Sequence, residues 1–298
     1  MEFAVWPGTQ QPWPDILEVA RHAELSGWDR VYVADHFMSN DDEAAGPMLE
    51  CWAVVTALAA AVPRLGIGTL VCGNTYRHPA VLANQAATAD VVSGGRIILG
   101  LGAGWQQNEH DRYGIELYGT KERLDRFAEA CAIVRSLTTR ERTTFHGEHY
   151  RLTDAPMEPK PIGPLPLLVG GGGEKRTLRI AAEHAQEWNV WSTPQVFAHK
   201  SAVLDRHCHD IGRDPAEIRR STQALLFLSE DESYLTRIRE GDVGRASIVG
   251  TPSEVVDIIG HYRDAGVDEL IVPDFTLGAG TRRRDTLDLF KEQVAVHF

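Results

Sequence analysis

Cysteine is scarce in this sequence, which has four cysteines among 298 residues. They lie at positions 51, 72, 131 and 208, without the close spacing of a zinc site, so they fit a reducing compartment better than a disulfide framework. No apolar run approaches the roughly 20 residues that a membrane-spanning helix needs. The first residues also lack the basic and apolar regions of a signal peptide. We therefore expect a cytoplasmic protein that makes no membrane contact.

Basic residues are in the minority as well, with 30 Lys and Arg against 42 Asp and Glu, a formal net charge of −12. A surface with this balance argues against binding the phosphate backbone of nucleic acid. The chain is 43% hydrophobic, enough to bury a substantial core. Its length suits one large α/β domain, and we expect that domain to span residues 1–298.

The stretch from Leu65 to Trp105 is the clearest structural signal in the chain. Residues 65–72 and 96–101 are continuous apolar runs typical of strands buried on both faces. Between them a helix is predicted to begin at Pro79 and to end before two glycines at 94 and 95. Two such strands joined by a helix form a right-handed parallel β-α-β unit. Because ligands bind at the carboxyl ends of parallel strands, the residues that follow these two strands are candidate site residues: Gly73, Asn74, Gly102, Ala103, Gly104 and Trp105.

Strand-like segments alternate with helical ones along the whole sequence. Eight strands are predicted to start near residues 1, 29, 65, 96, 167, 188, 221 and 269. This pattern predicts a (β/α)8 TIM barrel, with functional residues at the carboxyl ends of the strands. Residues 143–166 have no helical period and contain five prolines, so they are interpreted as an insertion made of a hairpin and an irregular excursion. We expect substrate contacts from this insertion and from the loop over residues 37–47.

A run of four glycines, Gly170, Gly171, Gly172 and Gly173, separates a predicted strand from a predicted helix. It does not match a P-loop, and the earlier GLGAGW segment lacks the third glycine of a dinucleotide-binding motif. Backbone N–H groups at the start of a helix nevertheless favour a phosphate, and Lys175 and Arg176 add positive charge. The alternative is a flexible turn.

Two pairs of ionisable residues follow predicted strands. Asp35 and His36 supply a carboxylate and an imidazole suited to ligand binding and proton transfer. The alternative is a helix-capping aspartate beside a packed histidine. Glu109 and His110 follow the fourth strand. They are interpreted either as residues that face the same end of the barrel or as a solvated loop pair. Without further metal-ligand spacing, these residues do not predict a metal site.

Three segments together resemble the luciferase-like monooxygenase superfamily, and more closely its coenzyme F420 (deazaflavin)-dependent branch. They are VADHF, the run TLVCGNTYRHPAVLANQAATADVVSGGRIILGLGAGW, and GGGGEKRTLRIAAEHAQEWN. The resemblance covers nearly the whole chain. It implies a TIM barrel with an insertion, in agreement with the strand count.

The resemblance also implies roles for individual residues. A bulge with a non-prolyl cis peptide, placed around Val71, Cys72 and Gly73, would support the deazaflavin ring. Asp35 would hydrogen-bond the cofactor, and His36 would sit beside its reacting carbon. The glycine run would hold the cofactor phosphate. Glu109 would match a glutamate that serves as proton donor in sugar-phosphate dehydrogenases of the family.

The first functional hypothesis is therefore an F420-dependent oxidoreductase that moves a hydride between the cofactor and a small organic substrate. The runner-up is an FMN-dependent monooxygenase of the same superfamily, supplied with reduced flavin by a separate reductase. A non-catalytic flavin-binding or carrier protein and a metal-dependent barrel hydrolase are further alternatives. By resemblance we expect a homodimer.

Overall fold

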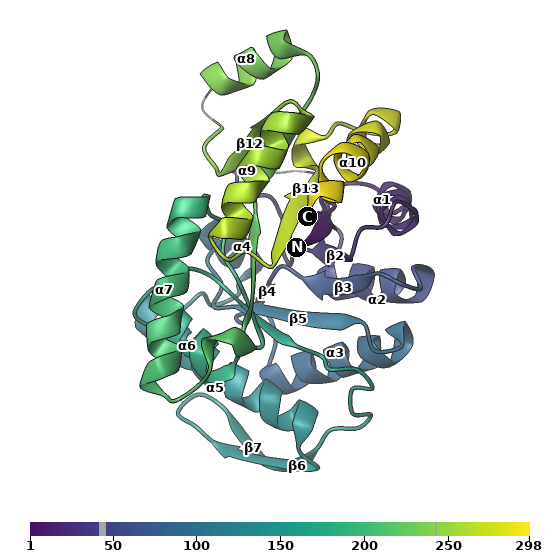
Figure 1. Ribbon diagram of the computed structural model, residues 1–298. Helices are drawn as coiled ribbons and strands as arrows, with labels where there is room; N and C mark the ends of the chain where they lie inside the picture. Colours follow the sequence, from purple (N-terminus) through teal and green to yellow (C-terminus); the bar gives the residue numbers. More distant parts are fainter. Residues whose placement is uncertain (42–45, 242) are drawn as a thin grey trace.

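Eight parallel strands close into a barrel in the computed structural model, which describes residues 1–41, 46–241 and 243–298. Each strand pairs with the next around the ring, and the last pairs with the first (Figure 1). The predicted (β/α)8 barrel is confirmed. In ring order the strands are β1 (Glu2–Trp6), β2 (Arg30–Val33), β3 (Gly66–Thr69), β5 (Ile97–Gly102), β8 (Leu167–Gly170), β9 (Glu187–Asn189), β10 (Arg219–Gln223) and β13 (Glu269–Pro273).

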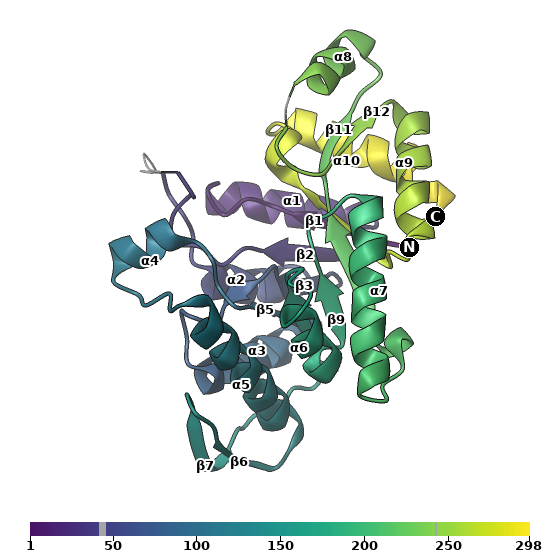
Figure 2. The same cartoon turned by 90° about the vertical axis from the view of Figure 1, so that its left-hand side faces the viewer.

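Helices surround the barrel and connect its strands (Figure 2). The helix between β3 and β5 begins at Pro79 as predicted, and Gly94 ends it with φ 74°, a left-handed conformation that glycine adopts without strain. Two short helices, α4 (Gln107–Tyr113) and α8 (Glu232–Glu240), lie outside the main ring. The main helices are α1 (Trp13–Leu25), α2 (Cys51–Ala61), α3 (Pro79–Ser93), α5 (Thr120–Thr139), α6 (Thr177–His184), α7 (Pro194–Asp210), α9 (Pro252–Asp264) and α10 (Thr281–Gln293).

The third strand is interrupted, although the sequence predicts it as continuous over residues 65–72. β3 ends at Thr69, the peptide bond between Leu70 and Val71 is cis, and a two-residue strand, β4 (Cys72–Gly73), then pairs with β5. The side-chain hydroxyl of Thr69 donates to the carbonyl of Gly100 at 2.8 Å and accepts from its N–H at 2.9 Å. These bonds take the place of the ladder bonds, so the main chain can depart from the strand path. The cis bond lies where the family resemblance placed it.

The strand predicted to start near residue 221 is divided between two sheets. β10 belongs to the barrel, whereas β11 (Leu225–Leu228) pairs with β12 (Ser247–Gly250) beyond it. Together with α8, this small sheet forms the upper part of Figure 1. β12 was missed because the residues before it, 231–247, are rich in charge and carry no strand period.

The predicted insertion contains an antiparallel hairpin of β6 (Arg142–His146) and β7 (Arg151–Pro156). The carboxylate of Glu129 on α5 accepts hydrogen bonds from the backbone N–H groups of Glu148, His149 and Tyr150 at the hairpin turn. The hairpin is therefore fixed to α5, on the outside of the barrel at the bottom of Figure 1.

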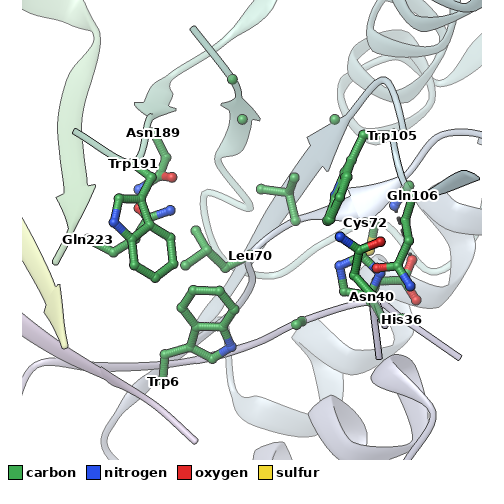
Figure 3. A pocket seen from close by; sticks show the side chains of 18 of the residues that line it. Trp6, His36, Asn40, Leu70, Cys72, Trp105, Gln106, Asn189, Trp191 and Gln223 are labelled. Atoms are coloured by element: carbon green, nitrogen blue, oxygen red, sulfur yellow. Dashed lines mark hydrogen bonds between the residues drawn. The ribbon is translucent and has the colours of Figure 1, made fainter. Parts of the chain in front are cut away.

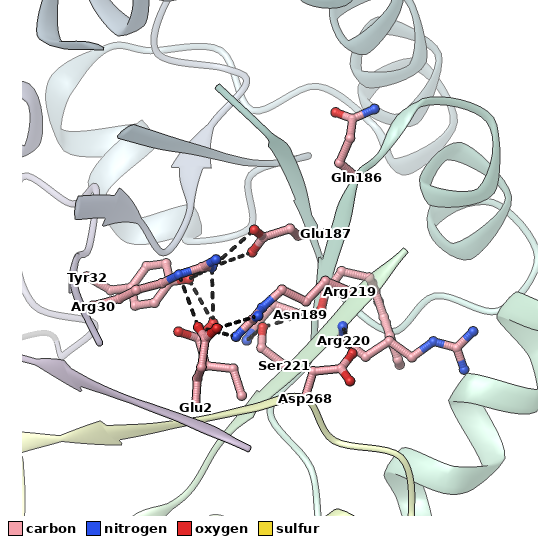
Figure 4. A network of polar contacts seen from close by, with 12 residues as sticks. Glu2, Arg30, Tyr32, Gln186, Glu187, Asn189, Arg219, Arg220, Ser221 and Asp268 are labelled. Atoms are coloured by element: carbon pink, nitrogen blue, oxygen red, sulfur yellow. Dashed lines mark hydrogen bonds and ion pairs between the residues drawn. The ribbon is translucent and has the colours of Figure 1, made fainter. Parts of the chain in front are cut away.

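The amino-terminal end of the barrel interior is closed by charged side chains at the starts of several strands (Figure 4). Arg30 donates to Glu187 at 2.8 Å and lies 3.5 Å from Glu269, which also accepts a hydrogen bond from Tyr32 at 3.0 Å. Buried leucine and isoleucine side chains fill the middle of the barrel together with Ala4, Trp6 and Tyr32. A ligand can therefore enter only from the carboxyl ends of the strands. None of the described helices is long and apolar enough to cross a bilayer.

Candidate functional site

A pocket opens at the carboxyl end of the barrel and is lined by residues that follow all eight strands. Figure 3 shows two facing walls, with Leu70 at the base between them. One wall carries Trp6 and Trp191 with the amides of Asn189 and Gln223. The other carries His36, Asn40, Trp105 and Gln106. Such a mostly apolar cavity with a few polar groups is typical of a site for a flat organic ligand.

The floor of the pocket is the bulge after β3. Val71 projects from it and is packed among glycines of the two neighbouring strands. A Cβ atom at Gly102 or Gly170 would lie 2.9 or 2.8 Å from a methyl group of Val71. A Cβ atom at Gly100 would lie 1.9 Å from the carbonyl oxygen of Thr69. The glycines therefore leave the space in which Val71 sits, and this fixes the height of the floor.

His36 and Glu109 form a hydrogen-bonded pair beneath the second wall. Nδ1 of His36 lies 2.8 Å from Oε1 of Glu109, and the backbone N–H of Phe37 donates to Oε2 at 2.9 Å. The hydroxyl of Tyr76 donates to Oε1 as well. The imidazole lines the pocket and is 26% exposed, whereas the Glu109 side chain is fully buried and does not reach the pocket. Sequence reasoning brought the two residues to the same end of the barrel but did not predict their pairing.

The pKa of Glu109 reflects two opposing effects. Burial raises it, but the hydrogen bonds from His36, Tyr76 and the N–H of Phe37 outweigh burial, so the pKa lies below the ordinary value for glutamate. Burial together with the bond to Glu109 raises the pKa of Tyr76, which stays a neutral donor. Glu109 is therefore a carboxylate at neutral pH. The alternative of a solvated loop pair is wrong, since His110 is also buried and both of its ring nitrogens have partners.

Asp35 is buried at the edge of the pocket and holds the bulge in place. Arg77 binds both of its oxygens, at 2.6 and 3.0 Å, and the N–H of Gly73 donates to it at 3.2 Å. Arg77 also reaches Glu50 at 2.6 Å. Asp35 therefore caps no helix, and its carboxylate is already committed to protein partners. Sequence reasoning missed Arg77 because the residue lies beyond the strand, and only the fold brings it back to Asp35.

The glycine run is only partly open to a ligand. Gly170 belongs to β8, and the N–H of Gly171 is bonded to the carbonyl of Asn189 at 2.9 Å. No hydrogen bond among the described residues uses the N–H of Gly172 or Gly173. Gly170 and Gly171 line the pocket together with Thr177 at the start of α6. Gly172 and Gly173, although predicted as site residues, are not among the lining residues. Their two unbonded amides lie next to the pocket and before α6, a position that favours an anion.

The family model for luciferase-like monooxygenases matches residues 1–237 of the chain. The chain belongs to the luciferase-like monooxygenase family. The family resemblance read from the sequence is confirmed.

Several curated relatives in this family are named F420-dependent glucose-6-phosphate dehydrogenase. The protein of Amycolatopsis mediterranei (strain U-32) is 38% identical over 161 residues, which are 53% of this chain and 48% of the relative. The protein of Beutenbergia cavernae is 36% identical over 296 residues, covering 87% of each chain. Other matches are shorter: the chain spans 48% of the length of the Amycolatopsis mediterranei protein and 64% of the length of another F420-dependent glucose-6-phosphate dehydrogenase. Among solved structures, an F420-dependent secondary alcohol dehydrogenase in complex with an F420-acetone adduct has a TM-score of 0.85 at 20% identity, covering 99% of this chain and 98% of its own.

Within this luciferase-like barrel, some expected site residues do not reach the pocket. Asn74 is buried beside it, with its amide N–H₂ 3.5 Å from the hydroxyl of Tyr150. Arg176 turns away to Asp125 on α5, at 2.5 Å, and Lys175 is exposed. Gly104, Cys72 and Gly73 line the pocket as predicted.

The two loops expected to contact the substrate differ in whether they reach the pocket. The insertion over residues 143–166 contributes no side chain to the pocket lining, because its hairpin packs on α5. From the loop over residues 37–47, Asn40 lines the pocket, and residues 42–45 lie outside the described part of the chain. Sequence reasoning also missed Trp6, Trp191 and Arg245, since nothing in their local sequence indicates that they face a ligand.

Proposed function

We propose that this protein is an F420-dependent oxidoreductase that transfers a hydride between the deazaflavin and a small organic substrate. The relatives named above support this assignment, and the observation that carries it is the His36–Glu109 pair beside the Val71 platform. When bound, the coenzyme supplies the hydride chemistry, so the protein must bind, orient and move a proton.

The residues present fit such a cofactor. Val71, Leu70 and Cys72 offer a narrow apolar platform for a flat ring, and the glycine run offers free amides for a phosphate. Asp35 acts on this site by fixing the bulge through Gly73 and Arg77. We assign cofactor binding to these residues together with Gly104 at the opposite loop.

His36 holds or accepts the proton that accompanies hydride transfer, and it does so at Nε2. Its Nδ1 is engaged by Glu109, so Nε2 is the ring nitrogen left for a substrate hydroxyl or carbonyl. The ionised carboxylate of Glu109 orients the ring and stabilises the imidazolium, as in other carboxylate–histidine pairs. Because it is buried and ionised, Glu109 acts through His36 and does not itself donate a proton to substrate.

The substrate proposed is a small molecule with an anionic group. In the described part of the chain, Arg245 is the only lysine or arginine that lines the pocket. Its guanidinium lies over the indole of Trp191, 4.7 Å from the ring centre, and it forms no ion pair with a described residue. Glucose 6-phosphate, from the names of the relatives, is therefore the first substrate to test. Arg245→Gln should raise KM for a phosphorylated substrate about fivefold and leave KM for a neutral alcohol unchanged, because an exposed charge pair is worth about 1 kcal/mol.

The deciding experiment identifies the cofactor. The purified protein is analysed by mass spectrometry and fluorescence for retained coenzyme and is then titrated with coenzyme F420 and with FMN. We expect binding of F420 and its reduction by glucose 6-phosphate or by a secondary alcohol. Exclusive binding of FMN, with oxygen consumption when a reductase is added, would favour the monooxygenase. Binding without any turnover across both substrate classes would favour the carrier protein.

We further propose a homodimer that forms through α2 and α3. These adjacent helices carry no charged residue apart from Asp90, which is buried. A charge-free exposed face is unusual on a protein in which 24% of residues are charged, and it is typical of an interface. Val81→Glu should convert a dimer to a monomer in light scattering after size exclusion, whereas Val296→Glu, at another exposed apolar site, should not. The exposed members of the face are Ala53, Ala60, Val81, Asn84, Thr88, Val91 and Val92.

A further inference from the structure

A carboxylate, that of Glu174, stands directly after the glycine run. Glu174 is held there by α7: its Oε1 accepts from Lys200 at 2.6 Å and pairs with Nε2 of His199 at 3.0 Å. Its backbone carbonyl is bonded to Nε2 of His207 at 2.7 Å. The hydrogen bonds from Lys200 and His199 keep the pKa of Glu174 below its ordinary value, so the group is negatively charged.

Lys200 is a cation that lies beside the glycine run. Its side chain packs against Gly172, where an added Cβ would lie 3.7 Å from the Cε of Lys200. The two cations expected from sequence lie elsewhere, since Arg176 is bound to Asp125 and Lys175 is exposed. The charge beside the glycine backbone thus comes from α7 and not from the start of α6.

We propose that Lys200 binds the cofactor phosphate at the glycine run and that Glu174 is a built-in competitor for Lys200. This inference rests on the proposed function, since it concerns the cofactor of that site. As the phosphate arrives, the Lys200 ammonium exchanges a carboxylate oxygen for a phosphate oxygen. His199 remains bonded to Glu174, so the released carboxylate keeps a partner. The exchange lowers the affinity for the phosphate and eases release of the cofactor.

The test measures dissociation constants for coenzyme F420 by fluorescence titration in four variants. Glu174→Gln should tighten binding about three- to tenfold, because a competing negative charge is removed. Lys200→Gln should weaken binding about five- to tenfold. In the double variant most of the gain from Glu174→Gln should disappear, because Glu174 acts mainly through Lys200. Lys175→Gln is the matched control and should change affinity less than twofold.

Inorganic phosphate serves as a second probe, measured by thermal shift on the same proteins. It should follow the same order, and the melting temperatures without ligand should stay close to that of the unmodified protein, because the three substituted side chains are exposed or partly exposed. Unchanged affinity in Lys200→Gln overturns the assignment of Lys200. Unchanged or weaker affinity in Glu174→Gln overturns the proposal that Glu174 competes with the phosphate for Lys200. If the unmodified protein binds neither F420 nor FMN, the proposed function is wrong, and the phosphate series alone then decides whether Lys200 is an anion ligand.

Discussion

Replacing His36 with alanine should separate catalysis from folding. Loss of a positioned acid or base costs roughly 10²- to 10⁴-fold in turnover. We expect a loss of this size because His36 lines the pocket and Nδ1 is held by Glu109, which leaves Nε2 for a substrate. Affinity for the cofactor should change little, since the floor and the glycine run do not depend on the imidazole.

The cost to stability should be small by comparison. The bond to Glu109 is charge-assisted and would be worth about 1.5 to 3 kcal/mol if fully buried. The His36 side chain is 26% exposed, and Glu109 keeps its bonds to Tyr76 and to the N–H of Phe37, so about 1 kcal/mol is a better figure. For a chain of this size, that free energy corresponds to a fall in melting temperature of about 2 to 4 °C.

The assay follows the visible absorbance of the deazaflavin with saturating substrate, per mole of folded protein. Melting temperature and cofactor affinity are measured on the same samples. His146→Ala, on the exposed hairpin, is the matched control and should behave as the unmodified protein. A His36→Ala enzyme with normal turnover and a large fall in melting temperature would refute the reasoning, because that is the behaviour of a packed structural histidine.

Three further predictions concern other parts of the molecule. Glu109→Gln should lower turnover roughly 10- to 100-fold with cofactor affinity unchanged, because an amide cannot stabilise the imidazolium; equal loss of affinity would contradict a role through His36. Gly170→Ala should weaken cofactor binding at least tenfold in a fluorescence titration by lifting Val71, whereas Gly260→Ala, with open space around it, should not. Burial raises the pKa of Glu269 to about 7, more than the charges of nearby arginines lower it. The folded protein therefore holds a proton that the unfolded chain, with a glutamate pKa of about 4.3, has lost, so stability should fall as pH rises from about 4.5 to 7. Denaturant titrations across this range should show a flatter profile for Glu269→Gln, and an unchanged slope would contradict the shift.

Much of the fold follows from local sequence. Continuous apolar runs and helix-terminating glycines predicted the barrel strands, and they also placed Asp35 and His36 at the end of β2. The interruption after Thr69 could not be predicted from periodicity, because the hydroxyl bonds that replace the ladder involve Gly100, a residue 31 positions away. The split between β10 and β11 was missed for a similar reason, since β11 pairs with a strand in a region without a period.

The site was predicted less completely than the fold. The positions of His36 and Glu109 at one end of the barrel followed from strand ends, but their pairing depends on how α4 packs beside β2. Arg77 lies within a quoted motif but was not singled out, and Lys200 and Arg245 lie outside the quoted motifs. Their partners, Asp35, Glu174 and Trp191, lie 42, 26 and 54 positions away in the chain, so only the fold brings them together. The charged residues that follow the glycine run in sequence, Lys175 and Arg176, were therefore a poor guide to the charged residue that lies beside it in the fold, Lys200.

The nest of glycines around Val71 limits how this pocket can be altered. A side chain at Gly100 would collide with the main chain, and one at Gly102 or Gly170 would collide with Val71, so β5 and β8 offer no position at which the floor can be reshaped gradually. The walls have no such constraint, since Trp6, Trp191 and Trp105 line the pocket and no glycine nest surrounds them in the described part of the chain. A library aimed at new substrates should therefore vary the indole positions and leave the three glycines untouched. Because the floor is fixed and the walls can vary, related proteins could change substrate during evolution while keeping the same cofactor.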